Sequence, residues 1–334
     1  MSDLAPFARV VHELNFLAAL LQTEPGHAAN AIPRANCGVT IISGFLGAGK
    51  TTLLRRILQG DHGKRLGVIV NDFGAVNLDA AAIAQDHGDV IELTNGCSCC
   101  AMGRDFGAAL ERIAGGDNAP DHVLVEASGL ADPAALATIA AGTRHGCAVG
   151  VVTLVDAESV DAWQAGALGS LFERQIDAAH LIVLTKTNSL GPASLERLKG
   201  QLAGRFPGRR IVTDRQIDPV MLFTAQVFGA RPLPVPVDHD LSRVVTRQIE
   251  PQRTWTKAAL SKQLEGMPGG ILRMKGWVRM AGGRLCEVQC VGSKFRLDPS
   301  GRLDEPAGLI LIGLRECEDD WADWITGFGA VQPA

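Results

Sequence analysis

A glycine loop followed by a lysine and a threonine carries the most specific chemical pattern in this 334-residue chain. Gly44, Gly49, Lys50 and Thr51 fit the spacing Gly-x-x-x-x-Gly-Lys-[Ser/Thr], in which backbone N–H groups cradle phosphates, the lysine meets the β- and γ-phosphates and the hydroxyl can ligate Mg²⁺. An incidental glycine-rich turn is the alternative, but the apolar run before the loop and the leucines after it favour a strand, a loop and a helix. The residues expected to bind phosphate are Gly44, Gly47, Ala48, Gly49, Lys50, Thr51 and Thr52.

Three thiols lie close together at Cys97, Cys99 and Cys100, directly after a predicted strand. Thiolates are soft ligands that suit Zn²⁺, Cu(I) or other late transition ions, and the Cys-x-x-Cys spacing of Cys97 and Cys100 lets two sulfurs reach one ion. Three thiolates on a tetrahedral ion leave one position open, which suits transfer better than a permanent structural role. Buried free cysteines or a redox pair remain the alternative, since no second Cys-x-x-Cys completes a four-sulfur site.

Two acidic residues also follow predicted strands. Glu126 ends an apolar strand and is followed by Gly129, so its carboxylate can hold Mg²⁺ through water or position an attacking water, while the glycine responds to the γ-phosphate. An ordinary surface glutamate before a turn is the alternative. Asp72 lies between the lysine loop and the thiols, where nucleotide switches usually lie, and can ligate Mg²⁺ or the thiolate-bound metal.

The alternation of strands and helices predicted from Gly38 onward would position these groups. Near-continuous apolar runs, as in strands buried on both faces, alternate with helical stretches. This alternation predicts an α/β fold with a doubly covered, mostly parallel sheet and a ligand at the carboxyl ends of its strands. The predicted strands are Val39 to Ser43, Gly67 to Asn71, Val90 to Leu93, His122 to Glu126, Val149 to Val155, Leu181 to Leu184 and Arg210 to Val212. The predicted helices include Thr51 to Gln59, Phe106 to Ala114, Pro133 to Ala141 and Pro192 to Arg205.

Four segments are expected along the chain. They are an N-terminal helical extension and tether at 1–36, a phosphate-binding domain at 37–228, a proline-rich linker at 229–242 and a smaller α+β domain at 243–334. The extension holds one amphipathic helix, roughly Phe7 to Leu21. The last segment is expected to contain a helix near Trp255 to Leu264, strands near Ile271 to Met280, Leu285 to Val291 and Leu309 to Leu314, and a terminal helix with tryptophan.

Composition narrows the function classes. A net charge of -4 and a pI near 6.1, with no basic tract, argue against nucleic-acid or anionic-membrane partners. The N-terminus has no basic n-region or membrane-length apolar run, so a cytoplasmic location is expected. Eight cysteines are too few for a disulfide scaffold in a chain of this length. Cysteines outside the cluster (Cys37, Cys147, Cys286, Cys290 and Cys317) are expected to pack in cores, and His122 and His180 to be structural.

Taken together and in order, the motifs resemble the CobW-type family of P-loop GTPases, which is related to the urease and hydrogenase nickel-insertion GTPases. The resemblance covers about residues 38 to 330. It rests on Thr-Ile-Ile-Ser-Gly-Phe-Leu-Gly-Ala-Gly-Lys-Thr-Thr-Leu-Leu, Val-Ile-Val-Asn-Asp-Phe-Gly, Asn-Gly-Cys-Ser-Cys-Cys, Val-Glu-Ala-Ser-Gly-Leu-Ala-Asp-Pro and Leu-Val-Asp-Ala. In the second domain it rests on Met267-Pro268 and on Leu272-Arg273-Met-Lys275-Gly276-Trp277.

The resemblance implies a GTP-dependent metallochaperone with a P-loop GTPase domain and a CobW-like C-terminal domain. Such a protein hydrolyses nucleotide to deliver a transition metal, zinc first and cobalt second, to a client metalloprotein, and related GTPases often form homodimers. The resemblance makes Lys50, Thr51 and Glu126 catalytic and places Mg²⁺ on Thr51. Nucleotide binding would order the Asp72 and Gly129 segments and change the thiolate coordination. The implied cargo ligands are Cys97, Cys99 and Cys100.

The chain departs from the family pattern at three places. The guanine-reading Asn-Lys-x-Asp is replaced by Thr185-Lys186-Thr187-Asn188, and an amide cannot accept both hydrogen bonds from guanine N1 and N2. Asp72 stands where the family usually has glutamate, and His239 is the one histidine near the linker. A metal-binding regulator with relaxed base selectivity and little turnover therefore stays open as the alternative. A P-loop kinase fits less well because the extra chemistry is thiolate.

Overall fold

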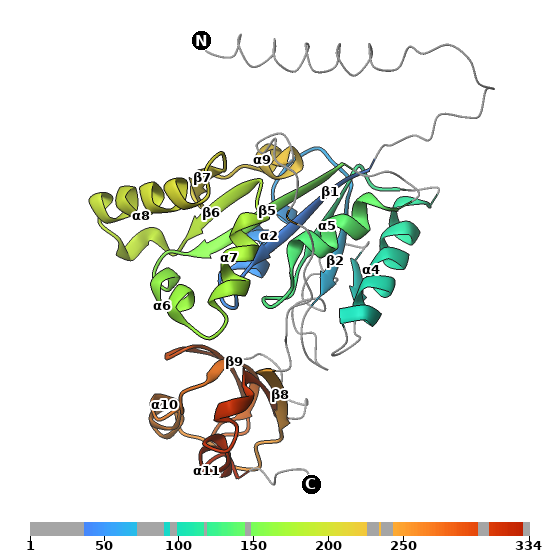
Figure 1. Cartoon of the computed structure of the whole chain (residues 1–334). Coiled ribbons are helices and arrows are strands. Elements are labelled where there is room, and N and C mark those ends of the chain that lie inside the picture. The colour runs from blue at the N-terminus through green and yellow to red at the C-terminus, as the bar shows by residue number, and fades with distance from the viewer. Residues whose placement is uncertain are drawn as a thin grey trace, which may run out of the picture. The chain divides into compact units, whose positions relative to one another are not determined.

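The computed structural model describes residues 37–71, 90–93, 99–116, 119–143, 148–225, 234, 243–299 and 307–329, which are drawn in colour in Figure 1. Segment 1–36 with its predicted helix, Asp72, Cys97 and His239 lie outside these residues, as does the predicted linker apart from residue 234. Two sheets form, one from each of the two predicted domains, and the domain boundaries themselves stay predictions.

The first sheet is parallel throughout, and all seven predicted strands are confirmed. Its order is β3-β2-β4-β1-β5-β6-β7, so β1 lies at the centre between β4 and β5. Parallel strands end at one edge, which brings the last residues of β1, β4 and β5 together: Gly44, Glu126 and Asp156. The strands are β1 (Gly38–Gly44), β2 (Leu66–Asn71), β3 (Val90–Leu93), β4 (His122–Glu126), β5 (Val149–Asp156), β6 (Leu181–Thr185) and β7 (Arg210–Thr213).

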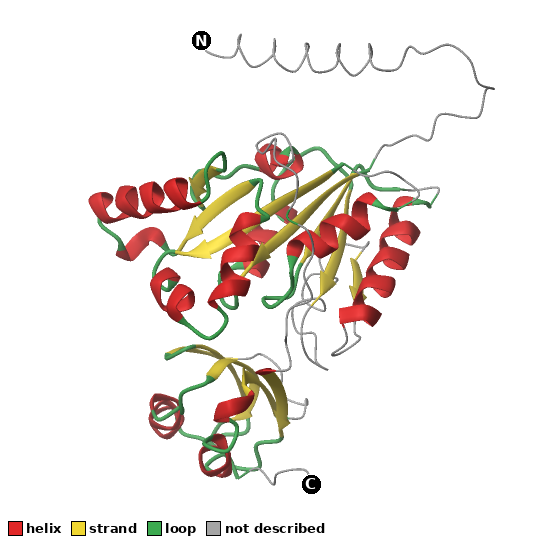
Figure 2. Ribbon diagram, in the orientation of Figure 1, coloured by secondary structure: helices red, strands yellow, loops and turns green. Residues whose placement is uncertain are grey.

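Helices cover both faces of this sheet (Figure 2). Side chains alternate along a strand, so Ile42 packs with α2 on one face while Ile41 packs with α4 and α5 on the other. Helix α4 begins at Cys99 rather than at the predicted Phe106. It continues through Gly103, because a glycine inside a helix lowers its stability without ending it. The helices are α2 (Lys50–Leu58), α4 (Cys99–Ala114), α5 (Pro133–Ala141), α6 (Val160–Ala165), α7 (Gly169–Asp177), α8 (Pro192–Arg205) and α9 (Pro219–Phe223), with the short 3₁₀ helix η1 (Thr187–Ser189) after β6.

The second sheet is antiparallel, in the order β11-β10-β9-β12-β8, as expected for a smaller α+β domain. Helices α10 (Lys257–Glu265) and α11 (Trp321–Thr326) pack their apolar residues into its core with Trp255 and Phe328. Strands β8 and β11 were not predicted, because both lie at sheet edges and are rich in polar residues. The strands are β8 (Val244–Ile249), β9 (Ile271–Arg279), β10 (Leu285–Val291), β11 (Lys294–Pro299) and β12 (Gly308–Leu314).

The histidines and most cysteines outside the thiol cluster have the structural roles expected for them. The Thr40 hydroxyl donates to the Leu222 carbonyl at 2.6 Å, so the 2.8 Å bond between Thr40 Oγ1 and His122 Nε2 is donated by the ring. Burial, with the Lys64 ammonium nearby, lowers the pKa of His122 to about 4. His180 Nδ1 accepts from the Val151 N–H at 3.0 Å. Cysteines buried in the cores are Cys37, Cys286 and Cys290. Cys317 is only half-buried, and Cys147 lies outside the described residues. Among the described helices, none is long and apolar enough to cross a membrane.

Candidate functional site

The loop between β1 and α2 has a backbone that glycine alone adopts easily. Gly44, Gly47 and Gly49 have φ of 137°, 73° and 94°. A Cβ on Gly44 would also lie 2.4 Å from the Leu154 carbonyl oxygen, so a side chain does not fit there. Gly49 precedes α2 with no side chain bonded to the first turn, which leaves backbone N–H groups of that turn directed at the loop. The glycines of the sequence pattern thus shape a phosphate-binding loop.

Lys50 places a positive charge inside this loop. Its side chain is buried, with 7% of the residue exposed, and its Nζ donates to the carbonyl oxygens of Gly44 at 2.7 Å and Phe45 at 3.2 Å. These bonds hold the ammonium across the concave side of the loop. A buried ammonium needs an anionic or polar partner, and phosphate oxygens supply both charge and acceptors.

Thr51 and Glu126 meet at the mouth of the loop. The Thr51 hydroxyl donates to Glu126 Oε1 at 2.6 Å, and Glu126 is buried at the end of β4. Residue 126 reaches this point because β4 pairs with β1 in the register Ile42↔Glu126. A hydroxyl and a carboxylate are oxygen ligands of the kind that Mg²⁺ prefers, so the donor set fits a magnesium ion here.

The segment after Glu126 packs directly on the phosphate loop. A Cβ on Gly129 would lie 2.5 Å from Leu46 Cδ2, so this position has no room for a side chain. Gln175 of α7, which is fully buried, donates from Nε2 to the carbonyls of Gly129 at 3.1 Å and Ala131 at 2.9 Å. Gln175 was missed in the sequence because a single glutamine in a helix belongs to no motif. It fixes the segment that we expect to respond to the γ-phosphate.

The residues after β6 divide into a supporting part and an exposed part. Thr185, which was expected to contact the nucleotide, is buried and donates to the Ala48 carbonyl at 2.8 Å, so its hydroxyl supports the loop from behind. Lys186 has a φ of 54° and pairs with Asp156 Oδ2 at 2.6 Å. Exposed Asn188 accepts a hydrogen bond at Oδ1 from the Arg215 guanidinium. Asp156 belongs to the quoted Leu-Val-Asp-Ala motif but was given no role, and Arg215 was missed because it is distant from the motifs in sequence.

The Asn188 amide gives a prediction about base selectivity. Guanine presents two donors at N1 and N2, whereas xanthine presents a donor and a carbonyl, which an amide matches. We expect Asn188→Asp to strengthen GTP binding roughly tenfold to a hundredfold and to weaken XTP binding by a similar factor. The carboxylate removes the mismatched contact with guanine and creates a mismatched contact with the xanthine carbonyl. Calorimetric titration measures both affinities, with ATP as the reference nucleotide. If the ratio of GTP affinity to XTP affinity did not change, the base would not contact residue 188.

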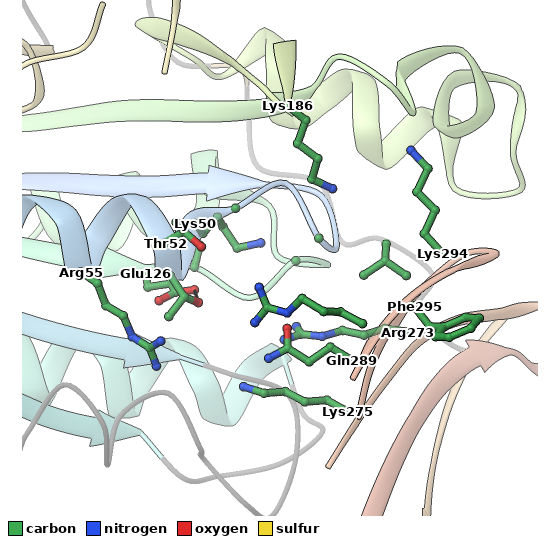
Figure 3. A pocket seen from close by; sticks show the side chains of 17 residues that line it. Lys50, Thr52, Arg55, Glu126, Lys186, Arg273, Lys275, Gln289, Lys294 and Phe295 are labelled. Carbon is green, nitrogen blue, oxygen red and sulfur yellow. Dashed lines mark hydrogen bonds between the residues drawn. The ribbon is translucent and has the colours of Figure 1, made fainter. Parts of the chain in front are cut away.

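A cavity of about 350 Å³ joins these groups (Figure 3). From the first sheet's loops it is lined by Gly47, Gly49, Lys50, Thr51, Thr52, Arg55, Glu126, Ala127, Gly129 and Lys186. The predicted residues Gly44, Ala48, Thr185 and Asn188 do not line it. The second sheet contributes the rest of the wall: Arg273, Lys275, Gln289, Val291, Lys294, Phe295 and Arg296. None of these seven was assigned to the site, although Arg273 and Lys275 belong to a quoted motif. The polar ones alternate with apolar residues, which is typical of an ordinary solvated strand face.

The predicted metal ligands are only partly covered by the described residues. Cys99 and Cys100 begin α4, after β3 has ended at Leu93. Cys97 and Asp72 lie outside the described residues. Within the described ranges, no three histidine, cysteine or carboxylate side chains gather as a metal site. The thiolate set therefore stays a prediction.

Two family models match the chain in the order predicted from its motifs. Residues 38–213 match "CobW/HypB/UreG, nucleotide-binding domain", and residues 244–322 match "Cobalamin synthesis protein cobW C-terminal domain". The first match covers more than half of the chain and spans the whole first sheet.

Similar curated proteins carry zinc-related names. The chain is 39% identical over 208 residues to "Zinc chaperone CobW" of Sinorhizobium sp, covering 52% of this chain and 58% of that protein. It is 36% identical over 201 residues to "Zinc chaperone YjiA" of Escherichia coli, covering 57% and 62%. In both cases the chain spans less than two thirds of the relative's length. A solved structure, that of the Zn(II)-bound YjiA GTPase from E. coli, is 23% identical with a TM-score of 0.42, covering 87% of this chain and 98% of that chain.

Proposed function

The chain belongs to the CobW/HypB/UreG family, and we propose that it is a GTP-dependent metallochaperone. In this proposal it hydrolyses a nucleoside triphosphate and delivers a transition metal, zinc before cobalt, to a client metalloprotein. Zinc is preferred because curated relatives are named zinc chaperones. A cytoplasmic location and a homodimer are part of the same proposal.

One observation supports nucleotide hydrolysis above the others. Thr51 donates to Glu126 at 2.6 Å inside a cavity that also contains the Lys50 side chain. A hydroxyl, a carboxylate and a buried ammonium at one strand edge are the set needed to bind Mg²⁺ and the terminal phosphates. Neither a purely structural glutamate nor a surface lysine would require this arrangement.

The proposed chemistry assigns a separate task to each side chain. Lys50 binds the β- and γ-phosphate oxygens and offsets the charge that develops between them. Glu126 accepts a hydrogen bond from water and orients it. Thr51 and Glu126 would hold Mg²⁺, which would supply further neutralisation of the phosphates. The backbone at Gly129 responds to the presence of the terminal phosphate, and Gln175 holds that segment through its hydrogen bond to the Gly129 carbonyl.

The metal enters the proposal as cargo. Cys97, Cys99 and Cys100 are proposed to hold the ion with one coordination position open, so that a client ligand can attack without prior dissociation. Coupling requires that the ion's affinity differ between nucleotide states, since a ligand shifts an equilibrium only through differential binding.

A titration tests the cargo assignment. We expect Zn²⁺ affinity to fall at least roughly a hundredfold when Cys97, Cys99 and Cys100 are all replaced by serine, since hydroxyls are poor zinc ligands. Competition with a chromophoric chelator, with and without GTP, measures this affinity. Cys317→Ser is the matched control, because Cys317 is a half-buried free cysteine of the second domain. Unchanged affinity in the triple variant would contradict the cargo site, and affinity independent of nucleotide would contradict the coupling.

The alternative is a metal-binding regulator with relaxed base selectivity and little turnover. The amide at Asn188, engaged by Arg215, is the observation that favours it. Turnover separates the two functions: zinc-loaded protein that hydrolyses neither GTP nor XTP in the presence of Mg²⁺ would leave the regulator as the better description.

A further inference from the structure

One face of the second sheet carries four of its basic residues in two cross-strand rows. In the first row, Lys275 of β9 and Arg296 of β11 flank Gln289 of β10. In the second row, Arg273 of β9 and Lys294 of β11 flank Val291 of β10 in the same way. Residues two apart on a strand share a face, so the four cations project together.

The opposite face of the same strands is the apolar core. Met274, Cys290 and Phe295 are paired across the strands, and each lies between two residues of the basic rows. Met274 and Cys290 are almost completely buried. The alternation therefore fixes the direction of the basic rows, because turning them around would put four charges into that core.

The side chains of the basic rows line the cavity that contains the phosphate loop. All four cations and Gln289 line it, and Figure 3 shows Lys275 and Gln289 reaching towards the side of the cavity that holds Lys50 and Glu126. Lys275 is only 9% exposed, which is unusual for a lysine on a sheet face. Its ammonium thus lies inside the cavity rather than in bulk water.

Two contacts fix this sheet against the phosphate loop. A Cβ on Gly47 would lie 2.7 Å from both methyl carbons of Val291, so the loop backbone and β10 are in van der Waals contact. Lys294 also forms an ion pair with Glu158, which follows β5. The requirement for glycine at position 47 therefore has two causes, its φ of 73° and the approach of Val291.

The charge of the cavity wall indicates an anionic ligand. Among its described lining residues are seven basic side chains and one carboxylate, that of Glu126, although the whole chain has a net charge of -4. Among the four cations of the basic rows, Lys294 is ion-paired with Glu158 and Arg296 with Asp298. Basic side chains that share one wall still repel one another, and a polyphosphate supplies further negative charge to offset that repulsion. The ligand class that fits a glycine loop with Lys50 on one wall and four cations on the other is a nucleoside triphosphate.

We propose that the basic rows of the second sheet are part of the nucleotide site and bind the terminal phosphate of a triphosphate. This inference rests on the proposed nucleotide-binding function. The loop binds the inner phosphates and Lys50 binds the β- and γ-phosphates from one side, and Arg273 and Lys275 contact the outermost phosphate from the other. Hydrolysis removes that contact, so the second sheet distinguishes the triphosphate state from the diphosphate state.

The test compares triphosphate and diphosphate affinity. The probes are the β,γ-imido analogue of whichever of GTP, XTP and ATP binds the wild-type chain most tightly, and the matching diphosphate, both with Mg²⁺. We expect Lys275→Gln and Arg273→Gln each to weaken analogue binding roughly tenfold to a hundredfold, because each removes a charge-assisted hydrogen bond, while diphosphate binding changes by less than about threefold. Arg273 is half-buried, so its variant gives a result even if the buried Lys275 is needed for folding.

Two further variants separate the possible failures. Lys257→Gln, on the exposed side of α10, is the matched control and should leave both affinities unchanged. If Lys50→Ala loses both nucleotides while the two sheet variants keep the wild-type ratio, the role of the second sheet is overturned and the nucleotide site stands. If wild-type protein binds no nucleotide, or Lys50→Ala binds as well as wild type, the proposed function itself is overturned.

Discussion

Replacing Lys50 with alanine is expected to lower nucleotide turnover by about a hundredfold to a thousandfold, the loss found when one preorganised donor to a developing negative charge is removed. Lys50 is 7% exposed and held at the carbonyls of Gly44 and Phe45, so its charge is positioned before any phosphate arrives. Phosphate release in the presence of Mg²⁺ measures the effect.

The matched control for this variant is Lys199→Ala. Lys199 lies on α8 and pairs with exposed Glu196 at 2.9 Å, an ion pair of little expected consequence. Far-ultraviolet circular dichroism checks that α2, which begins at Lys50, still forms. If a folded Lys50→Ala protein kept turnover within about threefold of wild type, the phosphate loop would have no part in hydrolysis, since P-loop chemistry depends on that ammonium.

The sequence predicted the first sheet well because its strands are buried on both faces. In a segment such as His122 to Glu126 the apolar residues are continuous, so the ends of the apolar run mark the ends of the strand. Helix α5 begins where predicted because Asp132 caps it and Pro133 occupies its first turn. Helix α7 was missed because its first residue is Gly169, which neither caps nor favours a helix.

The candidate site divides in the same way between local and distant residues. The phosphate loop is contiguous, so its spacing alone predicts which groups converge. Gln175, Asp156 and Arg215 contact the motifs from other elements, and only the fold brings them there. The basic rows are the strongest case, because the cations of β9 and β11 look solvent-facing until their common register with Gln289 and Val291 of β10 places them on one wall.

Replacing Glu126 with glutamine is expected to separate binding from turnover. Glutamine is nearly the same size, and its carbonyl oxygen can still accept the hydrogen bond that Thr51 donates at 2.6 Å. The negative charge is lost, so the side chain orients water and holds Mg²⁺ less well. We expect kcat to fall about a hundredfold to a thousandfold while triphosphate affinity stays within about threefold.

The readouts are single-turnover hydrolysis and binding of the β,γ-imido triphosphate, measured on the same preparation. Glu173→Gln is the matched control, because Glu173 is a surface carboxylate of α7 that pairs with Arg205. If Glu126→Gln lowered affinity and turnover by the same factor, Glu126 would act mainly in holding Mg²⁺ and nucleotide. If neither changed, the hydrogen bond between Thr51 and Glu126 would be structural, and the attacking water would be oriented by another group.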